Sequence, residues 1–172
     1  MKIAIIYASQ HGTTEHVAQK ISSQLDFPEV KLINISQVSK VDLSQYQMII
    51  LGSSIHAGNN QRSMQNFCTR NLTILLQKEV ALFLCCMREE EADASIQKAY
   101  PAVLRAKSLS CKVMGGEYRV DKMNFIEKFL LKKIAHVTES GSFLKQEAID
   151  EFVSDILDRH QKMKEERIEN LN

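Results

Sequence analysis

A short polar loop near the start of the chain combines residue types that can bind a phosphate group. In order, its residues are Ser9, Gln10, His11, Gly12, Thr13 and Thr14. Three of them carry hydroxyls, and Gly12 lets the backbone approach a ligand closely. The loop opens a segment with helical spacing, and N–H groups at a helix start favour an anion. The pattern indicates a phosphate site, although a Ser or Thr cap on an ordinary helix accounts for the same residues.

Two common nucleotide motifs are missing from this loop. It has no Lys in a G-x-x-x-x-G-K-[ST] frame, which argues against a nucleoside-triphosphate loop. It is not G-x-G-x-x-G either, so dinucleotide binding loses support. The four cysteines at 68, 85, 86 and 111 show no C-x-x-C spacing, so we expect neither a metal site nor a disulfide framework.

The elements that must position the loop alternate between strands and helices. Apolar or alternating runs predict strands over 2–7, 29–35, 48–51, 80–86 and 110–118. Helical spacing predicts helices over 15–25, 62–77, 92–107 and 125–137, and a last helix that includes 149–157. Five strands with intervening helices imply an α/β fold with a doubly wound parallel sheet. Such folds bind ligands beyond the carboxyl ends of the strands, here the loops after Tyr7, Gly52 and Cys86.

The first loop resembles the flavodoxin phosphate loop, [ST]-x-[ST]-G-x-[ST], except that His11 replaces a hydroxyl residue. The segment 52–58, Gly-Ser-Ser-Ile-His-Ala-Gly, resembles the second flavin-contacting loop of the same fold. The resemblance extends to about Arg159. Within the flavodoxin superfamily, the chain is most similar to the flavodoxin-domain group that includes the bacterial menaquinone-dependent protoporphyrinogen oxidase. An extra segment at about 117–145, before the last helix, carries this narrower likeness.

This resemblance implies a flavodoxin-like three-layer sandwich with a five-stranded parallel sheet and a non-covalent flavin mononucleotide (FMN). It implies that the FMN phosphate binds residues 9–14 and that the isoalloxazine ring lies between the second and third loops, which follow Gly52 and Cys86. The cofactor-binding residues expected in those two loops are Ser53, Ser54, Ile55, His56, Ala57, Gly58, Cys85, Cys86, Met87 and Arg88. The implied activity is an oxidoreductase that passes electrons from a porphyrinogen-like or other small substrate through flavin to a quinone or a redox partner protein. No catalytic acid or base is assigned.

Several readings stay open from the residues alone. The chain could be an electron-carrier flavodoxin, a flavin or quinone reductase, or a binding module without flavin. His56 could pack on the flavin or relay a proton, or be an ordinary loop residue. His11 could neutralise the phosphate, although we favour a side chain that points to solvent. Cys85 and Cys86 should point to opposite faces of a strand, and we favour buried small residues over a redox pair.

Composition bounds the remaining possibilities. The 172 residues carry 22 Lys and Arg against 21 Asp and Glu, a net charge of +1, which argues against a dedicated nucleic-acid binder. We expect one domain over 1–160 and a charged tail over 161–172, frayed or disordered. With no signal peptide evident, a cytoplasmic setting is expected. The segment 125–137 has apolar and basic sides, and could contact the inner face of the cell membrane peripherally or cover a hydrophobic substrate.

Overall fold

Five parallel strands form the centre of the structure. The computed structural model describes residues 1–9, 11–38, 40–54, 59–87, 89–118 and 141–169. The strands are β1 (Lys2–Tyr7), β2 (Glu29–Asn34), β3 (Met48–Ser54), β4 (Glu79–Cys85) and β5 (Ser110–Val113). Their order is β2-β1-β3-β4-β5, and each neighbouring pair is parallel. This is the flavodoxin-like strand order, so the predicted fold class is confirmed.

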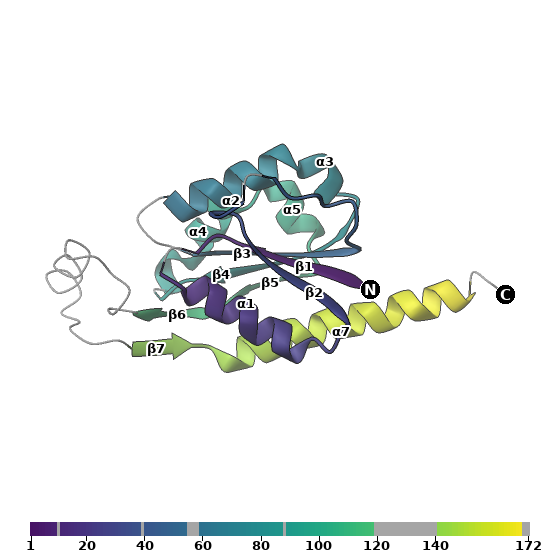
Figure 1. Cartoon of the computed structure of the whole chain (residues 1–172). Helices are drawn as coiled ribbons and strands as arrows, with labels where there is room; N and C mark the ends of the chain where they lie inside the picture. Colours follow the sequence, from purple (N-terminus) through teal and green to yellow (C-terminus); the bar gives the residue numbers. More distant parts are fainter. Residues whose placement is uncertain (10, 39, 55–58, 88, 119–140, 170–172) are drawn as a thin grey trace, which may run out of the picture.

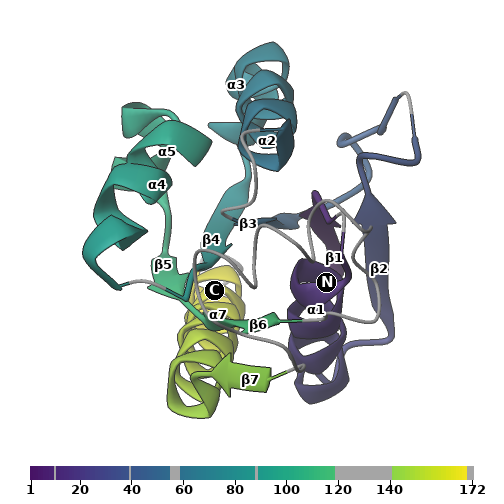
Figure 2. The same ribbon diagram turned by 90° about the vertical axis from the view of Figure 1, so that its left-hand side faces the viewer.

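Helices cover both faces of this sheet. One face carries α1 (Thr13–Gln24) and α7 (Gln146–Glu169). The other carries α2 (Asn59–Arg70), α3 (Leu72–Leu75), α4 (Ala92–Ala99) and α5 (Ala102–Lys107), and a 3-10 turn, η1 (Glu89–Glu91), precedes α4. Figures 1 and 2 show the three layers. The central strands are buried on both sides, which explains their continuous apolar runs.

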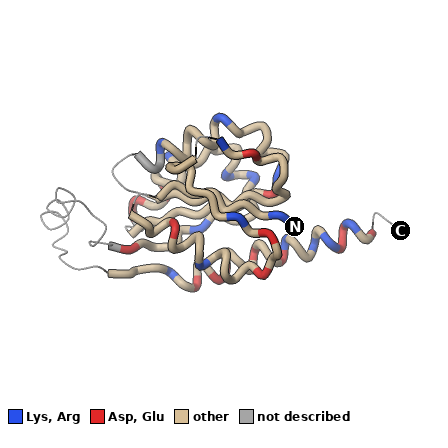
Figure 3. The backbone as a smooth tube through the Cα atoms, viewed as in Figure 1, with Lys and Arg blue, Asp and Glu red and all other residues tan. Residues whose placement is uncertain are grey.

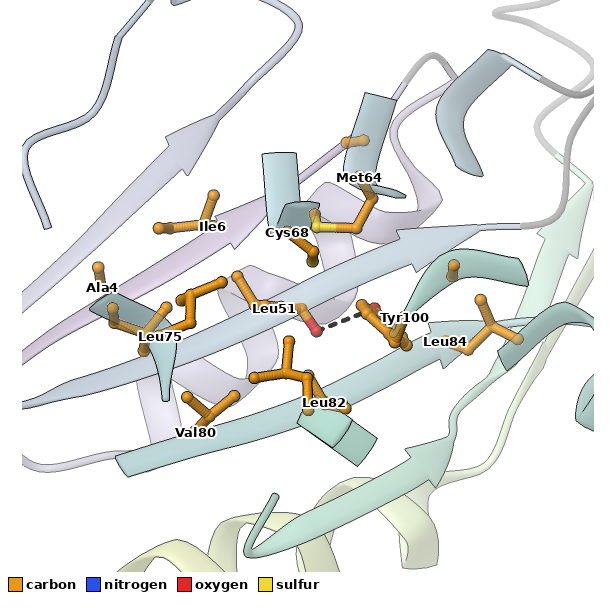
Figure 4. Packing of buried hydrophobic residues seen from close by; sticks show 14 of the residues in the cluster. Ala4, Ile6, Leu51, Met64, Cys68, Leu75, Val80, Leu82, Leu84 and Tyr100 are labelled. Carbon is orange, nitrogen blue, oxygen red and sulfur yellow. Dashed lines mark hydrogen bonds between the residues drawn. The ribbon is translucent and has the colours of Figure 1, made fainter. Parts of the chain in front are cut away.

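Tyr100 packs between the strands β3 and β4 and the helices that cover this face of the sheet. Its side chain is 1% exposed. Its hydroxyl lies 2.6 Å from the carbonyl oxygen of Phe83 and 3.1 Å from that of Leu51, as Figure 4 shows for the second contact. These two carbonyl oxygens satisfy the buried hydroxyl. Burial also raises the pKa of Tyr100 well above its ordinary value.

Two predicted helices are each divided in the structure. The segment 92–107 is α4 and α5, because Pro101 has no N–H to continue the first helix and stands at the cap of the second. The segment 62–77 contains most of α2 and all of α3. Asn71 separates them, with its side-chain amide donating to the Phe67 carbonyl oxygen at 2.8 Å.

The predicted fifth strand, 110–118, is also two strands. It follows the sheet to Val113, then turns at Gly115, whose φ of +72° lies in the left-handed region. A side chain there would collide with the Phe143 carbonyl oxygen. The chain leaves the main sheet as β6 (Gly115–Tyr118), which pairs antiparallel with β7 (Gly141–Leu144). The two strands form a ladder beside α1 and α7 (Figure 2).

The last helix extends past the body of the domain. Its buried residues end at Ile156, and Leu157, expected on the buried stripe, is 40% exposed. The helix continues to Glu169, through most of the segment expected to be a tail, and its second half projects beyond the sheet (Figure 1). The predicted helix 125–137 lies outside the described residues. Among the helices described, none has the length and hydropathy to cross a bilayer.

Candidate functional site

The first loop presents an open helix N-terminus at the carboxyl end of β1. Gly12 occupies the cap position of α1 with φ +90°, and no side chain caps this end. The Gly12 N–H donates to Ser9 Oγ at 3.1 Å, so this hydroxyl shapes the loop instead of capping the helix. The first intrahelical bond runs from the His16 N–H to the Gly12 carbonyl oxygen at 2.8 Å. The preceding N–H groups are the usual donors for an anion at a helix start.

The two threonines of the loop have different surroundings. Thr14 is 1% exposed, and its hydroxyl lies near the Cys85 thiol, where it lowers the thiol pKa against the larger effect of burial. Its hydroxyl makes no well-formed hydrogen bond with any described residue. Thr13 is 4% exposed, and its hydroxyl donates to the Glu117 carbonyl oxygen of β6 at 3.4 Å. A buried hydroxyl without a partner is unfavourable, so Thr14 is suited to an incoming acceptor, while Thr13 already has one.

His11 is buried, with 9% of its surface exposed, so the expectation that it points to solvent is wrong. At the same end of β1, the Tyr7 hydroxyl donates to the Glu15 carboxylate at 3.1 Å. Burial, followed by the nearby Glu15 charge, raises the pKa of Tyr7 to about 12.

The second loop starts beside the first. The Ala8 N–H donates to the Gly52 carbonyl oxygen at 3.1 Å, which ties the ends of β1 and β3 together. Ser53 and Ser54 are both buried. Strand alternation places Ser53 on the face of Leu51, toward α2 and α4, and Ser54 on the opposite face, toward α1. The Ser53 hydroxyl has no partner among the described residues, yet it lies on the other side of the sheet from Thr14.

The third loop begins with two buried cysteines. Cys85 packs with the α1 and α7 side of the core and Cys86 with the α2 and α4 side, as alternation predicts. Burial raises the pKa of the Cys85 thiol to about 12, which disfavours the reactive thiolate. The next residue, Met87, packs against Gly116 of β6, and the Cys86 N–H donates to the Gly115 carbonyl oxygen at 2.8 Å.

The structure adds two residues that the sequence did not single out. The Glu117 carboxylate, on β6, lies 3.0 Å from His16 Nδ1 on α1, and its side chain is 10% exposed. It also accepts a hydrogen bond from the Ser142 hydroxyl of β7 at 3.1 Å. No sequence signal pairs residues 101 positions apart.

Some predicted site residues lie outside the described part of the chain. They are Gln10, Ile55, His56, Ala57, Gly58 and Arg88, so their contacts with a cofactor stay predictions. In the part of the chain that is described, no group of three His, Cys, Asp or Glu side chains could hold a metal ion. What the described residues bring together is the uncapped start of α1 beside the carboxyl ends of β1, β3 and β4.

The chain is similar to several known proteins. The protoporphyrinogen IX dehydrogenase [quinone] of Escherichia coli K12 is 20% identical over 157 residues, which covers 87% of each chain. The same protein from E. coli O157:H7 gives the same values. Among solved structures, Megasphaera elsdenii flavodoxin in its two-electron reduced form is 20% identical, with a TM-score of 0.48, over 64% of this chain and 84% of that one. Fusobacterium nucleatum flavodoxin bound to flavin mononucleotide is 20% identical, with a TM-score of 0.46, over 65% and 68%. The flavodoxin domain model matches residues 4–144, and the chain therefore belongs to the flavodoxin domain family.

Proposed function

We propose that this chain is an oxidoreductase that binds FMN at the carboxyl ends of β1, β3 and β4. The observation that carries the proposal is the uncapped start of α1, with the buried Thr14 hydroxyl in its first turn and without a partner among the described residues. Both features fit a phosphate monoester, which offers several acceptor oxygens to donors of this kind. Membership of the flavodoxin domain family supports the same cofactor.

The protein's own residues would hold and shield this cofactor. The N–H groups of the first turn and the Thr14 hydroxyl would donate to the phosphate, and Ser9 and Gly12 would keep the loop in shape. No Lys or Arg stands in the loop, so neutral donors and the helix dipole would balance the phosphate charge. The flavin ring supplies the transfer of one or two electrons when bound.

We infer that the electron donor is a porphyrinogen-like or related small molecule and that the acceptor is a quinone. The support is the similarity to protoporphyrinogen IX dehydrogenase [quinone], which covers 87% of each chain. Each two-electron oxidation of the donor would convert one quinone to its quinol, with two protons taken up. Peripheral membrane contact through 125–137 and a cytoplasmic location stay predictions.

Titration with two flavins tests the cofactor. FMN should bind at least about tenfold more tightly than riboflavin, which lacks the phosphate, because hydrogen bonds to a charged group contribute about 1.5–3 kcal/mol. Quenching of flavin fluorescence reports both affinities. Equal affinities would contradict the phosphate site, and no binding of either flavin would favour a module without flavin.

Turnover tests the reaction. FMN-loaded protein should oxidise a porphyrinogen anaerobically when a quinone is supplied, and flavin-stripped protein should not. Rapid electron exchange with a redox protein, without quinone-coupled turnover, would instead indicate an electron carrier. Oxidation of a nicotinamide donor would indicate a reductase.

A further inference from the structure

A pocket lies at the end of the sheet where β1 and β2 begin, opposite the loop that precedes α1. Its volume is about 470 Å³, within the range of small-molecule sites. The projecting half of α7 forms one wall, and the segment at Pro28 and Glu29 forms another. Because β1 has six residues and a strand rises about 3.3 Å per residue, roughly 20 Å separates the two sites. We call this the α7 pocket.

The walls of the α7 pocket combine apolar surface with three basic side chains, Lys2, Lys164 and Arg167. Pro28 and Met163 contribute apolar surface. His160, Met163, Lys164 and Arg167 all line the pocket, and their spacing places them along one side of α7. Packing of the His160 ring edge-on against Phe27, with centroids 4.8 Å apart, ties this side of the helix to the domain.

The charges of the α7 pocket do not balance. Lys2, Lys164 and Arg167 line it, against a single carboxylate, Glu29. Glu29 is already bonded to Lys2 at 2.8 Å. Within the part of the chain that is described, no carboxylate pairs with Lys164 or Arg167. Figure 3 shows Lys and Arg interspersed with Asp and Glu along this half of α7; among the pocket-lining residues of α7, only cations are charged.

We propose that the α7 pocket binds a small amphipathic anion, a carboxylate carried on a short apolar body. The apolar body would lie against Met163 and Pro28, and the carboxylate would meet Lys164 and Arg167. The lowered pKa of His160, caused by burial and then by the Lys164 charge, is consistent with an excess of positive charge at this place. The site is independent of the proposed flavin chemistry, because none of its lining residues belongs to the phosphate loop.

Fluorescence titration with anilinonaphthalene sulfonate, an apolar anionic probe, tests the proposal on the full chain with and without saturating FMN. We expect saturable binding at one site, the same affinity in both states, and displacement by octanoate but not by octylammonium. Lys164→Gln combined with Arg167→Gln should weaken the binding about tenfold, because both cations of α7 that would meet the anion are lost. The matched control, Lys162→Gln with Arg70→Gln, removes the same charge from two exposed residues that do not line the pocket.

Three results would overturn the proposal. Equal loss of affinity in both double variants would indicate a general charge effect. Competition between the probe and FMN would place the probe in the phosphate loop. Displacement by octylammonium as efficient as by octanoate would indicate an apolar surface without selectivity for anions, such as one that a second copy of the chain covers; sedimentation at rising concentration identifies that case.

Discussion

The Glu117 carboxylate on β6 and the His16 imidazole on α1 form a hydrogen-bonded pair, with Oε1 3.0 Å from Nδ1. An ionised carboxylate only accepts hydrogen bonds, so Nδ1 carries the hydrogen. The carboxylate is the more buried partner, at 10% against 38% exposed. The pair joins the β6–β7 ladder to the first turn of α1, the helix that follows the loop at 9–12.

Substitution of either partner should therefore destabilise the protein. Glu117→Gln should lower the free energy of unfolding by about 1–2 kcal/mol, since a buried hydrogen bond to a charged group is lost. His16→Asn should cost less, because its ring is more exposed. Urea unfolding of both single variants and of the double variant checks this, and we expect a coupling energy of about 0.5–1.5 kcal/mol. Additive effects would mean that the pair does not hold the ladder to α1.

Removal of the Thr14 hydroxyl should separate stability from cofactor binding. Thr14→Val keeps the shape and removes a buried group that has no hydrogen-bond partner among the described residues. The protein without FMN should be equally or slightly more stable, while FMN affinity should fall about tenfold because a charge-assisted bond is lost. Thermal unfolding and fluorescence titration measure the two effects.

Two further threonine variants serve as controls for Thr14→Val. Thr13→Val should lower stability by about 0.5–1 kcal/mol, because Thr13 donates to the Glu117 carbonyl oxygen. Thr73→Val changes an exposed residue of α3 and should leave FMN affinity unchanged. A Thr14→Val protein that binds FMN as tightly as the wild type would remove Thr14 from the phosphate site.

The cysteines should differ in their reactivity toward alkylating agents. Burial raises the pKa of Cys68 and of Cys85 to about 12, so at pH 8 only about one thiol in ten thousand is the nucleophilic thiolate. Cys111 is less buried and should react first with iodoacetamide in the native protein. Mass spectrometry of native and urea-unfolded samples gives the order. Early modification of Cys85 would reopen the redox interpretation of that residue.

Stability should fall on mild acidification through His160. Burial and the Lys164 charge lower the pKa of His160 below 6.5, so near pH 6 the folded chain binds fewer protons at this group than the unfolded chain. This contribution is present above pH 6.5 and is lost as the pH falls below it. His160→Gln should flatten the change in urea midpoint between pH 7.5 and 5.5.

An NMR titration gives a second measurement of the same group. The His160 pKa should rise in Lys164→Gln and stay unchanged in Lys162→Gln, because the charge of Lys164, unlike that of Lys162, contributes to the shift. A pKa that does not respond to Lys164→Gln would contradict the electrostatic description of the α7 pocket.

The sequence predicts the parts of this structure that depend on local patterns. The continuous apolar runs at β3 and β4 and the polar loop before α1 are local features, so the type of sheet and the loop that starts α1 could be predicted, while the binding of phosphate by this loop stays a prediction. Burial of His11, and the division of the fifth strand at Gly115, depend on backbone geometry at single residues. Strand pairing of 115–118 with 141–144 and the contact between His16 and Glu117 join distant segments, so one sequence contains no pattern that reveals them.

The ladder of β6 and β7 has a consequence for the length of chain between the two strands. Tyr118 and Gly141 are paired across it, so the two ends of the segment 119–140 are held at neighbouring points of the domain. Closing a longer loop between fixed ends costs only about 0.6 kcal/mol for each doubling of its length. The number of residues between Tyr118 and Gly141 can therefore change at little cost to the paired strands. The ladder thus separates the packing of the sheet from the length of chain inserted between β6 and β7.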